Sequence, residues 1–446
     1  MRNNFFQACK RPVVFCLLAS GSFFSPASFS QTTASPASPP TQTTPTTPTT
    51  TSSTPPAKQT SKGCKGSNCT LPPPAQPPDT ALPPASPATP PQAVPSPAPV
   101  LPFVSWNFAV SGDSRNCGDA VMPMIAADVI KRKARFYWHL GDFRFMARVD
   151  EDMEHGPHHY GGLGFAYRRA AWRDFIDNQV TPFGVTPVFL GIGNHEMILH
   201  SNRDDYLRTF KPWIDSAIIH EQRRKDYPGA LDGSPALAVR TYYHWVLDGV
   251  DFITLDNASE GFDSRQMVWI AELLKRDAAM PEIKTLVVGM HEALPDSISA
   301  FHSMNQSEAG VTTGRIVYRA LWDLQQNYGK KVYVLASHSH FYMANVFNTP
   351  EWKGMMLPGW IVGTAGAHRY LLPASWRDAK DAMNNVYGYL VGNVQSDGAI
   401  KFEFKELKRD DVPPGVARNF DDNFVDWCFK SNTDCKDDNK HCEKPH

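Results

Sequence analysis

Five short apolar runs recur between residues 106 and 340, and each of them ends in polar residues. The runs read WNFAVSGDSR, RFYWHLGDFR, TPVFLGIGNHE, KTLVVGMHEA and KVYVLASHSH. They are short and rich in Val, Phe, Tyr and Leu, which is typical of buried β-strands. We therefore expect five strands in the interior of the protein.

Helical patterns lie between several of these runs. In DAVMPMIAADVIKRK and in SRQMVWIAELLKR the apolar residues recur at helical spacing. Met267, Ile270 and Leu274 share one face of the second segment, and Ser264 is its predicted N-cap. Strands that alternate with helices predict an α/β layered fold.

The polar residues that end the runs form a candidate site. In α/β folds, ligands bind outside the carboxyl ends of the strands. One Gly-Asp after a strand is usually a turn, and one buried His is usually only hydrogen-bonded, but five such strand ends together indicate a site. The metal-competent residues at these ends are Asp113, Asp142, Asn194, His291, His338 and His340.

These residue types predict a centre of two metal ions. Carboxylate, amide and imidazole groups without a thiolate suit Fe, Mn, Zn or Mg. Six ligands are too many for one tetrahedral ion, so we expect two divalent or trivalent ions, favouring Fe, Mn or Zn, that share a bridging carboxylate. His195 would lie beside the metals and meet the substrate, while Glu196 would orient its neighbours.

The order of the motifs resembles that of the calcineurin-like metallophosphoesterases. That family carries D-x-H, G-D, G-N-H-[DE], H and G-H-x-H in sequence, and this chain shows GDSR, LGDF, GNHE, GMHE and SHSH. The resemblance covers nearly all of residues 104–408 and includes LDNASEG, RQMVWIAELL and GWIVGTAGAHRY. It implies two facing mixed β-sheets flanked by helices, a dinuclear centre at one edge, and a phosphomonoester or phosphodiester substrate.

The resemblance also implies a role for each residue by its position. Asp142 would bridge the two ions, and His195 would act as a general acid toward the leaving oxygen. The other ligands would be Asn194, His291 and His338 for one ion, and Asp113 and His340 for the other.

Arg115 stands where the family has the His of D-x-H. A guanidinium has no acceptor, so it is no ordinary metal ligand. Distantly similar purple acid phosphatases place a Tyr ligand where this chain has Phe145, and Ser337 is a small change from the family's Gly. The affected ion would bind weakly, use water, or recruit Asn116 or Asp119. Arg115 itself would grip a substrate phosphate or form a structural salt bridge.

Three further segments carry candidate residues. Arg144, two residues after Asp142, is expected to face the site. Asp256 ends the run VDFITLD and is expected either to support the metal residues through hydrogen bonds or to form a plain turn. The segment EHGPHHYGGLGFAYRR would line a substrate cleft or lie on a solvated loop, and its histidines are His155, His158 and His159.

The composition divides the chain into four parts. Residues 1–30 combine basic residues, a short apolar run and small residues, which predicts a secretory signal peptide. Residues 31–100 are rich in Pro, Thr and Ser and predict a disordered linker, either a stalk in the cell envelope or a spacer. Residues 101–410 would form the metallophosphoesterase domain, and 411–446 a Cys-containing extension.

These features predict an exported protein that is periplasmic, secreted or at the cell surface. No later apolar run is long enough to span a membrane, so no transmembrane helix is expected after signal removal. The formal net charge of −1 gives no evident nucleic-acid-binding patch. The expected partner is a phosphoester substrate, with cell-envelope association through the linker.

Six cysteines would be left after removal of the signal peptide. An even number of cysteines in an exported chain indicates disulfide bonds. Cys64 and Cys69 bracket a short loop and are expected to pair. One of three C-terminal cysteines is expected to pair with Cys117, although these three would also suit a zinc knuckle; they are Cys428, Cys435 and Cys442.

Three functions stay open at this point. The leading hypothesis is a secreted, metal-dependent phosphoesterase. The second is a catalytically weak metal-binding protein of the same fold, which has one ion because of Arg115. The third is a GDSL-type serine esterase with Ser114 as nucleophile and His441 as base, because Asp438–His441 match a late D-x-x-H motif.

Overall fold

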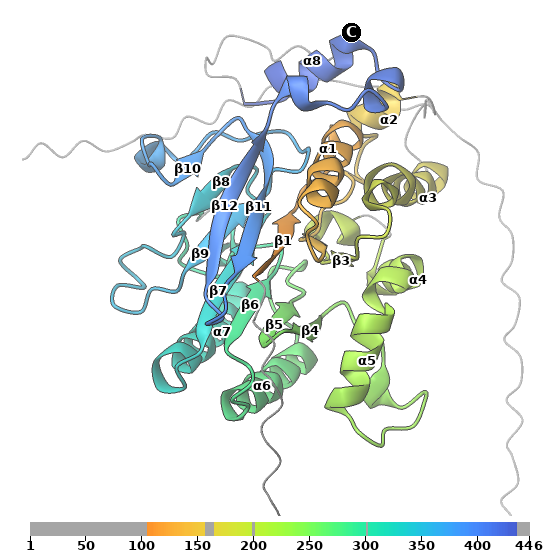
Figure 1. Ribbon diagram of the computed structural model, residues 1–446. Coiled ribbons are helices and arrows are strands. Elements are labelled where there is room, and N and C mark those ends of the chain that lie inside the picture. The colour runs from red at the N-terminus through yellow and green to blue at the C-terminus, as the bar shows by residue number, and fades with distance from the viewer. Residues whose placement is uncertain (1–104, 157–164, 199–200, 300–301, 435–446) are drawn as a thin grey trace, which may run out of the picture. The chain divides into compact units, whose positions relative to one another are not determined.

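Two mixed β-sheets face each other in the computed structural model (Figure 1). The structure describes residues 105–156, 165–198, 201–299 and 302–434. These residues all belong to one compact unit, Val94–His446. The predicted fold class, two facing mixed sheets flanked by helices, is confirmed.

The first sheet has five strands in the order β12-β11-β1-β2-β3. The three strands β1, β2 and β3 run parallel, while β11 is antiparallel to both β1 and β12. The strands are β1 (Trp106–Ser111), β2 (Tyr137–His139), β3 (Val188–Leu190), β11 (Tyr387–Val394) and β12 (Ile400–Leu407).

The second sheet has seven strands in the order β10-β8-β9-β7-β6-β5-β4. Its centre, β5-β6-β7-β9, is parallel, and its outer strands are antiparallel. The strands are β4 (Tyr243–Leu247), β5 (Val250–Thr254), β6 (Thr285–Gly289), β7 (Lys331–Ala336), β8 (Tyr342–Ala344), β9 (Gly359–Val362) and β10 (Ala382–Met383).

Eight α-helices are found in the described part of the chain. Apolar residues of α6 and α7 pack with Ile253, Leu286 and Val288 of the second sheet in an outer hydrophobic cluster. No helix among the described residues is long and apolar enough to span a membrane. The helices are α1 (Gly118–Lys131), α2 (Glu151–His155), α3 (Phe165–Asp174), α4 (Arg203–Ile214), α5 (Ala217–Asp226), α6 (Ser264–Ala279), α7 (Glu308–Asn327) and α8 (Asp422–Lys430).

Aromatic side chains fill the core between the sheets. The ring of Phe136, which directly precedes β2, lies 5.5 Å from Trp245 and 5.0 Å from Phe252 of the second sheet. Phe108 stacks on Phe136 at 5.2 Å, and all four side chains are almost fully buried. Each buried side chain of this size contributes about 1.5–3 kcal/mol, so these contacts hold the two sheets together.

The five apolar runs of the sequence form β1, β2, β3, β6 and β7, as predicted. The segment from Ser264 also forms the predicted helix, with Ile270 and Leu274 buried. The predicted N-cap is wrong, because Ser264 is already helical. Asp263 has an extended backbone and accepts the N–H of Gln266 at 2.8 Å, which caps the first turn.

A disulfide bond joins Cys117 to Cys428. Cys117 directly precedes α1, and Cys428 lies in α8, 311 positions later. The prediction that a C-terminal cysteine reaches Cys117 is confirmed. The other four predicted disulfide candidates lie outside the described residues.

Candidate metal centre

The predicted site residues lie directly after the carboxyl ends of strands from both sheets. Asp113, Asp142 and Asn194 follow β1, β2 and β3, while His291 and His338 follow β6 and β7. The parallel runs of the two sheets therefore deliver these side chains to one edge. Backbone hydrogen bonds connect the loops that carry these residues. The Asp113 N–H donates to Gly141 O, and the Ser337 N–H donates to His291 O.

Four donor atoms converge from Asp142, Asn194, His291 and His338. His291 Nε2 lies 2.9 Å from Asn194 Oδ1, 2.9 Å from His338 Nδ1 and 3.3 Å from Asp142 Oδ1. Ligand atoms of Asp142, His291 and His338 all lie within 4.8 Å of one another. We call these four residues the four-donor group. Two imidazoles, a carboxylate and an amide at this spacing fit one divalent cation.

Hydrogen bonds at Nδ1 fix the orientation of the His291 ring. Its Nδ1 lies 3.2 Å from Leu140 O and 3.1 Å from Ser337 Oγ, so the Nδ1–H donates to these oxygens. Nε2 is thereby left to face Asp142. Fixing one ring nitrogen in this way sets the tautomer that a metal-binding histidine needs.

Arg115 contacts the second set of predicted ligands. Its Nη1 donates to Nε2 of His195, and its Nη2 donates to Nε2 of His340 at 2.8 Å. Its Nε lies 3.8 Å from Asp142 Oδ2. Asp113 Oδ1 lies 3.2 Å from the same His340 nitrogen. The guanidinium thus lies among the residues that the sequence assigned to the other ion.

Two buried carboxylate oxygens in the site have no hydrogen-bond partner among the described residues. They are Asp113 Oδ1 and Asp142 Oδ2. A buried charge is costly unless cations lie close to it. Asp142 presents Oδ1 to the four-donor group, while its Oδ2 lies 3.8 Å from Arg115 Nε. Asp113 Oδ1 lies 3.2 Å from His340 Nε2, which accepts from Arg115. The four-donor group can thus hold a metal ion, while Arg115 is the cation that lies beside the two unpaired oxygens.

The charges of the site set its protonation states. Burial alone would raise the pKa of Asp113 and Asp142, but His291 and Arg115 lower both values below the usual range. Burial, together with the Arg115 charge, lowers the pKa of His340 to about 4. Despite burial, Asp142 and Asp113 raise the pKa of His291. Ionised carboxylates and neutral imidazoles are the forms that bind metals, so Asp113, Asp142 and His340 are in these forms, whereas His291 would release a proton when a metal binds.

Backbone conformation at the site is unusual. Asp113, Asp142 and His338 have positive φ angles of 61°, 60° and 63°. Such angles are uncommon for residues other than glycine and cluster at functional sites. At Gly193 the lack of space, rather than the backbone angle, requires a glycine. A Cβ there would lie 2.3 Å from Asp142 Oδ1 and 2.9 Å from His291 Nδ1.

Glu196 holds two of the loops together, as the sequence predicted. Its carboxylate is fully buried and accepts the N–H groups of Asp142, Phe143 and Gly193 at 2.8–2.9 Å. Burial and the Asp142 charge raise the pKa of Glu196 to about 8, although the three hydrogen bonds act to lower it. This side chain fixes the Asp142 loop relative to the Asn194 loop.

Three residues near Arg115 make contacts with the site that were not predicted. The Phe145 carbonyl accepts the Nδ1–H of His195 at 2.5 Å, and its ring lies 5.2 Å from the Arg115 guanidinium. Tyr370 stacks on His340 at 4.1 Å and on His302 at 5.1 Å. The segment GAHRY contains Tyr370, but no pattern in the sequence indicates its ring contact or that of His302.

Arg144 does not face the predicted metal residues. It is fully buried and pairs with Asp119, Asp152 and Asp174. Asp119 also accepts from Gln179 at 2.8 Å, so it is not available as a replacement ligand.

Two other predicted supporting residues are engaged elsewhere. Asn116 donates to Glu151, and its Oδ1 accepts the His368 N–H at 3.3 Å. Asp256 pairs with Arg203 at 2.7–2.8 Å and accepts from Thr241. Its predicted contact with the metal residues is wrong.

Asn257, one position after Asp256, has the supporting contacts instead. Its side chain donates to Glu292 O at 2.7 Å and accepts the Glu292 N–H at 3.1 Å, directly beside His291. His155 is the last residue of α2 rather than part of a solvated loop, and its ring stacks on Phe424 of α8 at 5.2 Å. His158 and His159 lie outside the described residues.

The geometry around Ser114 does not suit a serine nucleophile. Gly141 N–H donates to His139 Nδ1 at 3.2 Å, so His139 carries its proton on Nε2 and donates it to Ser114 Oγ at 2.9 Å. Both side chains are fully buried, and burial lowers the pKa of His139 to about 3. A histidine that donates to the hydroxyl cannot take its proton. His441 lies outside the described residues.

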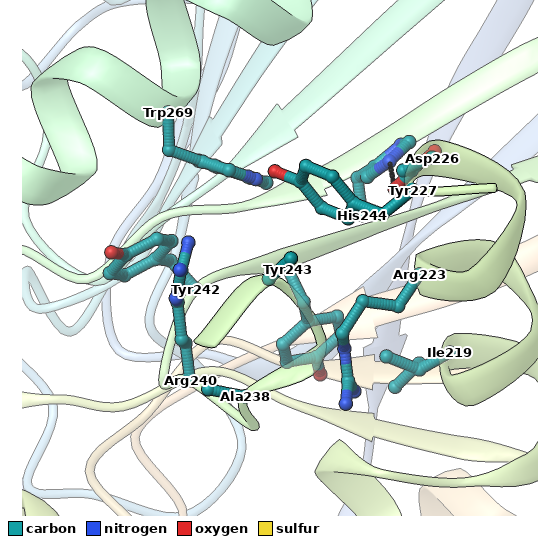
Figure 2. A pocket seen from close by; sticks show the side chains of 11 residues that line it. Ile219, Arg223, Asp226, Tyr227, Ala238, Arg240, Tyr242, Tyr243, His244 and Trp269 are labelled. Carbon is teal, nitrogen blue, oxygen red and sulfur yellow. Dashed lines mark hydrogen bonds and ion pairs between the residues drawn. The ribbon is translucent and has the colours of Figure 1, made fainter. Parts of the chain in front are cut away.

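A separate cavity of about 30 Å³ lies beside α5 and β4, and Figure 2 shows its lining. None of the predicted site residues lines it. Its polar end is an ion network in which His244 bonds to Asp226 at 2.7 Å and to Asp251 at 2.8 Å. Arg276 also contacts His244 and Asp226, and Asp277 lies beside Asp251. This network is a structural feature away from the candidate metal centre.

No family model and no curated protein matches this sequence. Among solved structures, GAP50, the anchor in the inner membrane complex of Plasmodium, is 12% identical with a TM-score of 0.42, covering 68% of this chain and 84% of its own. A dimetal phosphatase from Danio rerio is 10% identical with a TM-score of 0.42, covering 68% and 98%.

A purple acid phosphatase from yellow lupin (Lupinus luteus) seeds is 14% identical with a TM-score of 0.41, and the match covers 68% of this chain but 52% of that one. Likenesses at this level transfer no activity. In its two facing mixed sheets, and in the order of the motifs at their carboxyl ends, this chain resembles the calcineurin-like metallophosphoesterases.

Proposed function

We propose that this protein is a metal-dependent phosphoester hydrolase. The observation that carries the proposal is the convergence of the four-donor group, in which His291 Nε2 lies within 3.3 Å of ligand atoms from the other three residues. These residues come from both sheets and would hold one divalent cation. Such an ion polarises a phosphoryl oxygen and lowers the pKa of bound water.

The protein's own residues would position the substrate next to this ion. His195 lies beside the four-donor group, because its N–H donates to Asp142 Oδ1 at 3.0 Å and its Nε2 lies 3.7 Å from Asp142 Oδ2. Arg115, whose two Nη groups donate to His195 and His340, would add a fixed positive charge near the phosphate. Asn194, which is half-buried, would present a neutral oxygen to the ion.

The test is elemental analysis paired with a phosphoester panel. The full chain is stripped with a chelator, reconstituted separately with Mn, Zn and Fe, and assayed on an aryl phosphate monoester and diester. We expect bound metal and metal-dependent hydrolysis, both lost in His291→Ala. His220→Ala changes a half-exposed histidine of α5 and serves as the matched control. A wild-type chain that binds no transition metal would overturn the proposal.

A second candidate function is metal binding with little or no catalysis. The specific observation is that Arg115 donates to His195 Nε2 while Phe145 O accepts the hydrogen bond of the Nδ1–H. His195 is therefore a neutral acceptor in this arrangement, although a general acid must carry a proton on the reacting nitrogen. Stoichiometric metal without hydrolysis of any phosphoester in the panel would favour this candidate.

We also propose that the protein works outside the cytoplasm. The basic and apolar character of residues 1–30 supports export. The Cys117–Cys428 disulfide is consistent with an oxidising compartment. Detection of the processed protein in the extracellular or envelope fraction tests this proposal, and full-length protein confined to the cytoplasm would contradict it.

A further inference from the structure

The residues around Arg115 are arranged as a cation site. The side chain is buried, and its Nη1 and Nη2 donate to the Nε2 atoms of His195 and His340. Asp142 Oδ2 lies 3.8 Å from its Nε, and Asp113 Oδ1 lies next to the same His340 nitrogen. Two imidazole lone pairs and two carboxylates would equally suit a metal ion.

Backbone carbonyls fix both imidazoles in the required tautomer. His195 donates its Nδ1–H to Phe145 O, and His340 donates its Nδ1–H to His368 O, both at 2.5 Å. The remaining nitrogen of each ring therefore presents a lone pair to the guanidinium. Tyr370 stacks on His340 and the Phe145 ring lies beneath Arg115, so the guanidinium is packed in place.

We propose that the Arg115 guanidinium permanently takes the place of the second metal ion, so that the protein binds one ion per chain. The inference rests on the proposed function, because it needs the four-donor group to bind the first ion. Arg115 carries its positive charge at every accessible pH and offers no lone pair. For a second metal ion to bind, the Arg115 side chain would have to break two hydrogen bonds and move away from two buried carboxylates.

The charges account for this replacement. Asp113 and Asp142 are fully buried and together carry two negative charges, which need compensation in a low-dielectric interior. A metal ion at the four-donor group would lie against Asp142, whereas Arg115 places its positive charge next to His340, which Asp113 contacts. The loss of a ligand at position 115 is thus matched by the gain of a resident cation.

The experiment measures metal stoichiometry, which does not depend on activity. Wild type, Arg115→His, Arg115→Ala and Arg148→His are reconstituted with excess Mn²⁺, desalted and analysed for metal per chain. Arg148 is the matched control, because it also lies over the Phe145 ring, at 4.5 Å, but is half-exposed and pairs with Glu151. Electron paramagnetic resonance then tests whether two Mn²⁺ ions in one chain are magnetically coupled.

We expect one ion in wild type and in Arg148→His, and two coupled ions in Arg115→His. Arg115→Ala, which removes the guanidinium without adding an imidazole, is expected to take up more than one ion and serves if the His variant does not fold. Two ions in wild type, or one ion in both folded Arg115 variants, would overturn the inference. Failure of wild type to bind any ion would instead overturn the proposed function.

Discussion

Replacing Gly193 by Ala is expected to displace the Asp142 carboxylate and weaken metal binding. The backbone of Gly193 has a φ of −110° and a ψ of 179°, which alanine adopts without strain. The effect would therefore come from contact alone. The new Cβ would lie 2.3 Å from Asp142 Oδ1 and 2.6 Å from Asp142 N.

The magnitude follows from these distances. Ordinary contacts begin at 3.4 Å, so Asp142 Oδ1 must move by about 1 Å. That oxygen accepts the His195 N–H at 3.0 Å and lies 3.3 Å from His291 Nε2, so the movement disturbs the four-donor group. We expect a cost of about 1–3 kcal/mol in stability and a loss of at least ~10-fold in metal affinity.

The assay is competition for Zn²⁺ against a chromogenic chelator, with thermal unfolding of the metal-free proteins in parallel. Gly415→Ala is the matched control, because a Cβ there would meet nothing closer than Arg418 Nη2 at 3.8 Å and the backbone is helical. Metal affinity of Gly193→Ala within twofold of wild type would refute the reasoning, since it would mean that Asp142 Oδ1 is not needed for binding.

Three other perturbations test separate parts of the structure. His195→Ala is expected to lose most turnover at unchanged metal content, because the imidazole lies beside the four-donor group; equal loss of both would contradict its assigned place. Cys428→Ser removes the disulfide to Cys117 and is expected to cost about 2–5 kcal/mol, measured as a lower Tm that matches reduced wild type; an unchanged Tm would count against it. Despite burial, Asp251 and Asp226 raise the pKa of His244 to about 10. The protonated His244 therefore stabilises the folded state fully below about pH 6.5, and this contribution is lost as the pH rises toward 10. His244→Gln should flatten the dependence of the free energy of unfolding in urea on pH over this range. Parallel profiles of the two proteins would refute it.

The sequence predicted the elements that local pattern determines. Each of the five apolar runs is bounded by a polar residue and forms a buried strand, so the carboxyl-end residues could be assigned before the structure was known. The joining of two sheets at one edge came from family resemblance, because strand order depends on contacts between distant segments. The cap of α6 was misplaced by one residue, since Asp263 and Ser264 are both good caps and only the backbone decides between them.

Side chains with long reach could not be placed from the sequence. Arg144 is two residues from Asp142, but residues from three other segments, Asp119, Asp152 and Asp174, draw it into a buried ion network. Spacing along the chain predicts at which strand end an arginine lies. The direction in which its side chain points depends on where the buried carboxylates lie in the folded protein. The same limit applied to Tyr370 and His302, whose rings contact site residues from separate loops.

Arg115 shows how a substitution in a motif acquires its meaning from its surroundings. The sequence reveals that a ligand is missing, but an arginine there is compatible with a substrate grip, a structural salt bridge or a replacement cation. The positions of His195 and His340 favour the last, because both lone pairs point at the guanidinium. Buried carboxylates require positive charge rather than a metal in particular. A chain can therefore keep the two-sheet fold and its ionised aspartates while changing its metal content, so the motif order alone does not determine how many ions it binds.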